Sequence, residues 1–330
     1  MNNLIILPSE PLAECFVYLC RLKKQRMGSS DHLKGVLYAL VAGVMWAVLA
    51  VALKITLNIY ALTPFTIVWF RFSIAFFILG AVLLVKHPSL YRVFYKPPLK
   101  LIIATLCLGF NYYAYMRGLD NSTPSNASVF TLLGPVLFAI TGIYIFKEKI
   151  TWLHITGFLI VITGLCLFYW EQIGAMADQK NYSIGILWIV ASSVAWVIYG
   201  LLQKDLTKQY STNQLNLFIY GICSLIFLPG MHLSGFASLD FPGWLLVVFL
   251  GLNTLIAYGA IALAFRYLDS SKVSVILTMS PVITFLIMYM FMVLNITLIT
   301  AEHFSWLSIL GAAIALSGCV FVILFTRVKE

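Results

Sequence analysis

Two short polar motifs lie inside long apolar stretches of this 330-residue sequence. One reads Gly-Phe-Asn-Tyr-Tyr-Ala-Tyr over residues 109–115, and the other reads Gly-Leu-Asn-Thr-Leu-Ile-Ala-Tyr over residues 251–258. The amides of Asn111 and Asn253 each offer two donors and two acceptors, enough to bind a carboxylate, an amide or a ring nitrogen. An amide among apolar residues is costly unless it finds partners. Two such amides in matching settings indicate a polar site in each half of the chain.

Aromatic residues accompany these amides. Trp46 and Trp196 each offer a flat wall and one donor, and Tyr115 and Tyr258 each follow one of the asparagines. The tryptophans and asparagines lie roughly ten to thirteen residues into their apolar stretches, near the middle of a helix that rises ~1.5 Å per residue. We therefore expect them to line a substrate site. The alternative is structural, with amides that bond helices together and rings that only pack.

Two cations and two prolines also lie within the apolar stretches. Arg71 is about eight residues from the end of its stretch, or roughly 12 Å deep, and no Asp or Glu lies at a similar depth. It can meet an anionic group of a substrate or the free carbonyls of a broken helix. Lys54 is closer to an end, so we expect its ammonium to reach the interface. Pro135 and Pro281 each remove a backbone donor, which predicts a kink or flex point.

The segments that must position these residues are apolar helices. The chain is 62% hydrophobic and only 10% charged, whereas soluble domains are about 25% charged. Continuous apolar runs of roughly 20 residues have the length of a membrane-spanning helix. We therefore predict an all-α polytopic membrane protein. Its ten expected spans are 34–57, 63–85, 99–117, 125–146, 152–170, 183–203, 212–231, 243–265, 272–294 and 303–326.

The distribution of positive charge predicts the orientation. With a cytoplasmic N-terminal tail (1–33), 17 of the 21 Lys and Arg residues fall on the cytoplasmic side, and only Arg117 and Lys180 lie in the opposite loops. Positive charge concentrates in cytoplasmic loops of membrane proteins. This predicts both termini in the cytoplasm and a location in the cell (cytoplasmic or inner) membrane. It also accounts for the net charge of +9 without a nucleic-acid partner.

The two halves of the chain carry matching residues, which predicts two repeats, 34–170 and 183–326. Each repeat has five helices, and because five is odd the second must cross the membrane in the opposite sense, as in many secondary transporters. The matches, at spacings of 150 and 154 residues, are Gly35 with Gly185, Trp46 with Trp196, Lys54 with Lys204, Glu148 with Glu302, Gly157 with Gly311, and Gly164 with Gly318.

Several of these residues resemble the pattern of EamA-type members of the drug/metabolite transporter superfamily. The resemblance covers roughly residues 34–326, and the stretch Leu294–Ala301 departs from it. It implies a ten-helix transporter of small metabolites, often an exporter, with a central cavity between the repeats. The residues that carry it are Trp46, Lys54, Arg71, Ala127-Ser128, Gly134-Pro135, Glu148 to Thr151, Gly157 and Gly164, then Tyr258, Leu263, Ser274, Ser280-Pro281, Glu302, Gly311 and Gly318.

We therefore predict a secondary transporter of a small polar or zwitterionic metabolite such as an amino acid, working by alternating access and in the direction of export. The expected substrate-binding residues are Trp46, Arg71, Asn111, Tyr115, Trp196, Asn253 and Tyr258. Coupling to a proton or to an exchanged substrate is left open, as is the oligomeric state.

Two alternatives are an exporter of lipophilic cations and a non-transporting membrane scaffold. A cation exporter would be expected to use a buried carboxylate, yet all 12 acidic residues fall in tails, loops or helix ends. The chain carries no enzyme motif and no metal-ligand spacing, so we expect neither catalysis nor a cofactor.

Overall fold

The computed structural model describes residues 29–86, 91, 93–145, 152–175, 179–268, 273, 276–296, 298–299 and 305–325. The expectations for residues 1–28 of the tail, for Glu148 and for Glu302 concern residues outside these ranges. Every regular element in the described ranges is a helix. In chain order they are α2 (Ser29–Ile59), α3 (Pro64–Lys86), α4 (Leu99–Asp120), α5 (Pro124–Phe130), α6 (Leu133–Ile145), α7 (Trp152–Ala175), α8 (Gln179–Leu206), α9 (Thr212–Phe227), the 3-10 turn η2 (Leu228–Gly230), α10 (Ser234–Ala237), α11 (Phe241–Tyr267), α13 (Ser280–Val293) and α14 (Trp306–Phe325).

Most of these helices are apolar enough to lie in a bilayer, so the chain is a multi-pass membrane protein. Within the described residues, six stretches have both the length and the composition of a membrane span: His32–Ile59, Pro64–Val85, Leu99–Asp120, Lys180–Leu206, Thr212–Gly230 and Phe241–Ala264. Three further apolar stretches are shorter: Ile155–Glu171, Ser280–Val293 and Trp306–Phe321.

The span expected over 125–146 is broken into α5 and α6. The break falls at Thr131 and Leu132, just before Pro135. Proline has no N–H for the carbonyl four residues earlier, here that of Thr131, and its ring collides with it. The Thr131 carbonyl accepts instead from Gly134 N at 2.9 Å. The second proline behaves alike, because a turn at residues 278–279 precedes α13 and Pro281. The helix is therefore interrupted just before each proline, where the sequence predicts a kink or flex point.

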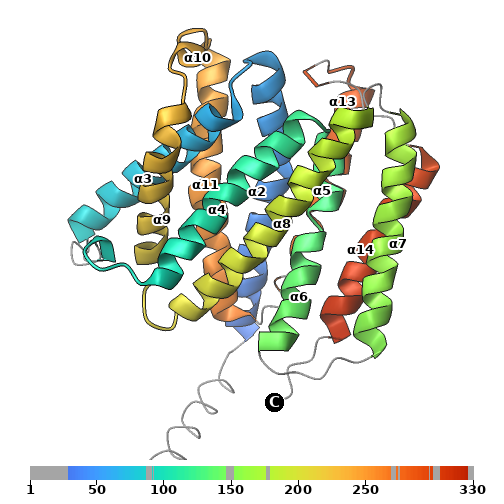
Figure 1. Ribbon diagram of the computed structural model, residues 1–330, viewed down its shortest axis with the longest axis horizontal. Coiled ribbons are helices and arrows are strands. Elements are labelled where there is room, and N and C mark those ends of the chain that lie inside the picture. Colours follow the sequence, from blue (N-terminus) through green and yellow to red (C-terminus); the bar gives the residue numbers. More distant parts are fainter. Residues whose placement is uncertain are drawn as a thin grey trace, which may run out of the picture.

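The main contacts between helices are symmetric: each has an equivalent in which every helix is replaced by its counterpart from the other half of the chain (Figure 1). In the first half α4 packs on α8 and α9, and in the second half α11 packs on α2 and α3. Likewise, α6 packs on α8 as α13 packs on α2. The pairs α3–α9 and α7–α14 join equivalent helices of the two halves. This is the contact pattern expected of two repeats related by a two-fold axis.

Segments predicted to lie on one side of the membrane meet in the structure. Lys100 Nζ, at the start of α4, lies 2.6 Å from Asp205 Oδ2 near the end of α8. At the opposite end of the bundle, the Tyr60 hydroxyl donates to Asp240 Oδ1 at 3.0 Å. Helices α4 and α8 therefore run antiparallel to each other, as do α2 and α11.

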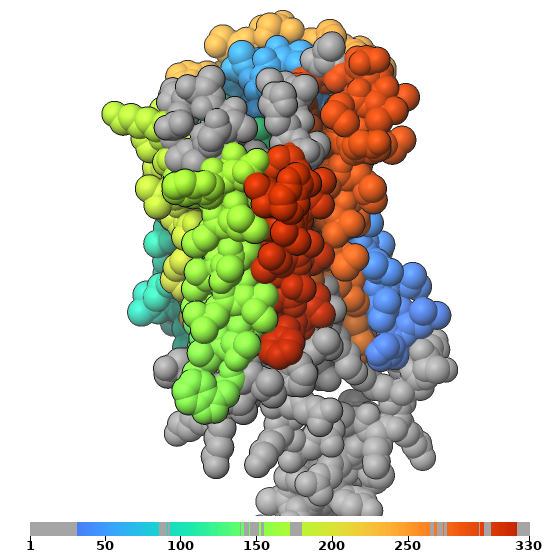
Figure 2. Space-filling model, turned by 90° about the vertical axis from the view of Figure 1, so that its right-hand side faces the viewer, coloured from blue at the N-terminus to red at the C-terminus, as the bar shows by residue number. Residues whose placement is uncertain are grey.

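Helices α7 and α14 lie side by side over one face of the molecule (Figure 2). Glycines let their backbones approach closely. A Cβ placed on Gly311 would lie 2.7 Å from Phe168 N, and one placed on Gly318 would lie 2.8 Å from Val161 N. Small residues at such contacts are typical of helix pairs in membranes, where packing rather than water exclusion drives association.

The expectation for Lys54 is wrong. Its side chain is buried, and Nζ donates to the carbonyls of Leu119 at 2.9 Å and Asp120 at 3.0 Å. These carbonyls belong to the last turn of α4, where the regular helical hydrogen bonds end, and the Leu119 carbonyl also accepts from Ser122 N at 3.2 Å. The C-terminal end of a helix also carries partial negative charge. The ammonium therefore has a partner within the protein and does not need the interface.

Candidate functional site

A cavity of about 140 Å³ lies between the two halves of the chain, in the middle of the helix bundle. Six of the seven residues predicted to bind substrate line this central cavity: Trp46, Arg71, Asn111, Tyr115, Trp196 and Tyr258. The remaining wall comes from α2, α4, α8 and both broken helices: Leu49, Tyr112, Ser128, Thr131, Leu132, Gly134, Pro135, Ser192, Ser193, Leu277, Ser280 and Pro281.

The repeat-matched tryptophans meet in this cavity. The ring centroids of Trp46 and Trp196 are 6.1 Å apart, and their planes are nearly perpendicular at 85°. Tyr258 lies 6.2 Å from Trp46, also edge to face. Such pairs gain from the negative face and positive edge of each ring. Together the three rings form an aromatic wall to which both repeats contribute.

Arg71 is the charged residue in the cavity wall. It is only 3% exposed, its Nε donates to Thr254 Oγ1 at 3.1 Å, and its Cζ lies 4.4 Å from the centroid of the Tyr112 ring. None of the ion pairs formed by the described residues involves it. A buried cation without an anion is costly. The other four N–H groups of the guanidinium have no protein acceptor in the described part of the chain, so a bound molecule can use them.

Asn111 is held against α8. Its Nδ2 donates to Ser192 O at 3.0 Å and to Ser192 Oγ at 2.8 Å. These bonds occupy both donors and fix the amide, which leaves Oδ1 as an acceptor toward the cavity. Ser192 and Ser193 also line the cavity but were not among the predicted residues. They precede Trp196 by four and three residues, and this helical spacing could have identified them.

Asn253 has different surroundings. It does not line the central cavity, it is 1% exposed, and its Nδ2 donates to Met45 O at 2.8 Å. It therefore bonds α11 to α2 one residue away from Trp46. Its Oδ1 has no hydrogen-bond partner in the described part of the chain. The prediction that it binds substrate remains a prediction, and this geometry favours the role of joining helices.

A second, larger cavity of about 880 Å³ lies between α6, α8 and α11. Its wall is mainly apolar, but Gln203, Lys204 and Lys208, at and just beyond the end of α8, add polar and basic groups. Trp196 and Tyr258 line both cavities. These two rings therefore separate the central cavity from the second one.

The fold and the central cavity define a class: a multi-pass helical membrane protein whose two matching halves enclose a cavity with polar side chains in its wall, as transporters do. Residues 33–170 and 183–324 match the EamA-like transporter family. The chain belongs to that family.

Individual relatives agree with this assignment. An uncharacterized transporter of Haemophilus influenzae is 31% identical over 290 residues, which cover 87% of this chain and 94% of the relative. The uncharacterized inner membrane transporter YhbE of Escherichia coli K12 is 29% identical over 292 residues, which cover 87% of this chain and 90% of YhbE. A solved crystal structure shares the fold, with a TM-score of 0.62 at 20% identity over 89% of this chain and 98% of the other.

Proposed function

We propose that this protein is a secondary transporter that exports a small polar or zwitterionic metabolite, such as an amino acid, by alternating access around the central cavity. Arg71 carries this proposal, because it is a buried cation whose remaining donors face the cavity without a protein anion. A carboxylate of the substrate supplies the missing charge. Asn111 adds an acceptor for an ammonium or hydroxyl group, and the tryptophans enclose the apolar part of the substrate.

The transport cycle requires a particular membrane arrangement. We propose ten spans in two inverted five-helix repeats, 34–170 and 183–326, with both termini in the cytoplasm and the protein in the cytoplasmic membrane. The matching helix contacts of the two halves support this arrangement. So do the contacts between segments of the same predicted side.

The alternatives fit the site less well. A lipophilic cation would meet the guanidinium of Arg71 at close range in a region of low dielectric constant, where like charges repel strongly. A scaffold would have no use for a cavity that contains a buried cation of this kind. We propose no catalytic role, since the cavity wall holds neither a carboxylate nor a histidine in the described ranges.

Transport by purified protein in proteoliposomes tests the proposal. The twenty amino acids are first screened for thermal stabilisation of the full chain, since a ligand stabilises the state that it binds. Counterflow of the best stabiliser is then measured for the wild type, Arg71→Gln and Arg71→Lys. Arg117→Gln is the matched control, because it removes an exposed arginine near the end of α4.

We expect Arg71→Gln to weaken binding by roughly 10- to 100-fold, the usual effect of losing a hydrogen-bonded charge partner. Arg71→Lys keeps the charge and should retain part of the affinity. The Arg117→Gln variant should behave as wild type. Stabilisation by lipophilic cations but by no amino acid, or normal counterflow in Arg71→Gln, would contradict the proposal.

A further inference from the structure

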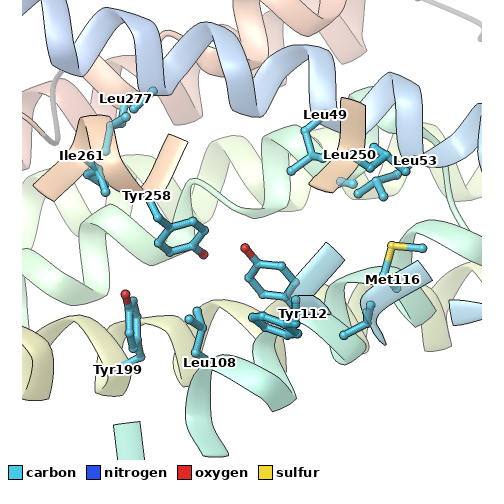
Figure 3. Close-up of a cluster of buried hydrophobic side chains, with 14 of the residues drawn as sticks. Leu49, Leu53, Leu108, Tyr112, Met116, Tyr199, Leu250, Tyr258, Ile261 and Leu277 are labelled. Atoms are coloured by element: carbon cyan, nitrogen blue, oxygen red, sulfur yellow. The ribbon is translucent and has the colours of Figure 1, made fainter. Parts of the chain in front are cut away.

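Three tyrosines from three helices meet where the central cavity borders the second one, and a fourth lies within electrostatic reach of two of them. The three are Tyr112 of α4, Tyr199 of α8 and Tyr258 of α11, and the fourth is Tyr220 of α9. The hydroxyls of Tyr112 and Tyr258 point toward one another, and that of Tyr199 points into the same space (Figure 3). The ring centroids of Tyr112 and Tyr199 lie 5.9 and 6.2 Å from that of Tyr258. We call these four residues the tyrosine cluster.

Three hydroxyls of the tyrosine cluster are buried without a hydrogen-bond partner. The residues Tyr112, Tyr199 and Tyr220 are 4%, 3% and 1% exposed. None of their hydroxyls forms a hydrogen bond of ordinary geometry within the described residues, although Tyr112 lies close to Thr254 and Tyr258, and Tyr199 lies close to Gln203. Buried hydroxyls are normally satisfied, so several unpaired ones that gather beside a cavity and a buried cation mark a place where a bound molecule supplies the partner. Three such groups in one place indicate a single small ligand.

The positive charge of Arg71 near the tyrosine cluster determines which charge the ligand should carry. Tyr112, Tyr220 and Tyr258 all lie within electrostatic reach of the Arg71 guanidinium. A guanidinium only donates hydrogen bonds, and a phenol hydroxyl can always donate one. A molecule that accepts from all of these groups, and that also neutralises the guanidinium, is an anion. Hydrogen bonds to a charged acceptor are roughly twice as strong as neutral ones.

We propose that Arg71 and the hydroxyls of the tyrosine cluster form a carboxylate-binding subsite where the central cavity borders the second one. The carboxylate of the substrate binds at the tyrosine cluster, and its apolar part lies against Trp46 and Trp196. The assignment to a substrate rests on the proposed transport function, whereas binding of a carboxylate does not. This orientation makes carboxylates the substrate class and excludes their amides and esters.

Binding of acetate to the purified full chain tests the subsite, with acetamide as the neutral probe of the same shape. The melting temperature is measured against concentration of each probe at constant ionic strength. The test variants are Tyr199→Phe and Tyr220→Phe, neither of which removes a wall residue of the central cavity. The matched control is Tyr182→Phe, because Tyr182 is also buried with an unpaired hydroxyl but stacks on Tyr169.

We expect acetate, but not acetamide, to stabilise the wild type and Tyr182→Phe. In Tyr199→Phe and Tyr220→Phe, the half-saturating acetate concentration should rise roughly tenfold, as for loss of one hydrogen bond to a charge. The variants should fold, because removing an unpaired buried hydroxyl leaves no partner behind. Equal stabilisation by acetamide would overturn the proposal, as would an unchanged acetate midpoint in both variants.

A second measurement separates a substrate carboxylate from a free anion such as chloride. Counterflow of L-leucine, chosen because its apolar side chain suits the tryptophan wall, is measured with competing acetate, chloride or L-leucinamide. Competition by acetate, with none by L-leucinamide, supports the subsite. If chloride displaces acetate but leaves leucine counterflow unchanged, the subsite holds a free anion and the substrate assignment is wrong.

The two proposals fail in different ways. Acetate binding with the expected variant pattern, in a protein that transports no amino acid, would support the subsite and contradict the transport proposal. Amino acid counterflow without any acetate stabilisation would support transport and overturn the subsite.

Discussion

Asn111 and Asn253 are equivalent in sequence, yet their side chains lie in different surroundings. Both amide nitrogens donate across a helix contact, to Ser192 and to Met45 respectively. Only Asn111 also borders the central cavity. An exchange of conformation between the repeats during transport would account for this difference, because each repeat would then take the other's position in turn. The asymmetry of the two amides is therefore compatible with the symmetry of the helices.

The two alanine variants should separate binding from stability. In Asn111→Ala, a polar group of the substrate loses its partner, at a cost of about 1–3 kcal/mol or roughly 5- to 100-fold in affinity. In Asn253→Ala, the loss should appear in stability, at about 0.6 kcal/mol for an average hydrogen bond between membrane helices. Substrate affinity and melting temperature are measured for both variants. Normal substrate affinity in Asn111→Ala would show that Asn111 does not bind the substrate.

At the scale of a helix, Lys54 completes the end of α4. Replacing it by Met leaves the carbonyls of Leu119 and Asp120 without this donor, which should cost about 1–3 kcal/mol of stability. Lys54→Arg retains the charge and should recover part of the loss. Lys180→Met, which removes an exposed lysine at the start of α8, serves as the control. Equal melting temperatures for Lys54→Met and wild type would show that the bonds contribute nothing.

The close contact between α7 and α14 makes a second prediction at this scale. A Cβ on Gly311 would meet the backbone nitrogen of Phe168 at 2.7 Å, whereas one on Gly259 would meet nothing within 4 Å. Gly311→Ala should therefore lower stability by about 1–3 kcal/mol through overpacking. Gly259→Ala should raise stability by about 0.4–1 kcal/mol, because alanine restricts the unfolded chain. Denaturation in detergent compares the two, and equal effects would exclude the packing explanation.

For the whole molecule, the membrane orientation is the property to measure. Single cysteines are placed at Asn121 and Asn181 and at Lys96 and Lys208, in a variant whose native cysteines are replaced. The charge distribution predicts that an impermeant thiol reagent labels the first pair from outside, and the second pair only after the membrane is opened. Reversal of any one of the four would contradict the ten-span arrangement.

The sequence predicts how deep a residue lies along its span better than it predicts which way the side chain points. The depth of Trp46, Arg71 and Asn111 follows from counting residues along an apolar run, and these residues do line the central cavity. The direction of a side chain does not follow from a helix that is apolar on most faces. Lys54 was misjudged for this reason, and Asn253 does not line the central cavity, since the partners of both residues come from other helices. Tyr220 illustrates the same limit, because an isolated tyrosine in an apolar run carries no sign of its neighbours.

The pairing of α7 with α14 also has a consequence for how the chain is made. Helix α7 ends at Ala175, but its partner begins only at Trp306, about 130 residues later. At a synthesis rate of about 5–20 residues per second, α7 waits on the order of 10 s in the lipid before that partner leaves the ribosome. During that interval its glycine-lined strip faces lipid or an unrelated helix. The last helix to be inserted therefore completes the first repeat as well as the second, and a nascent chain that stops before α14 leaves both repeats unfinished.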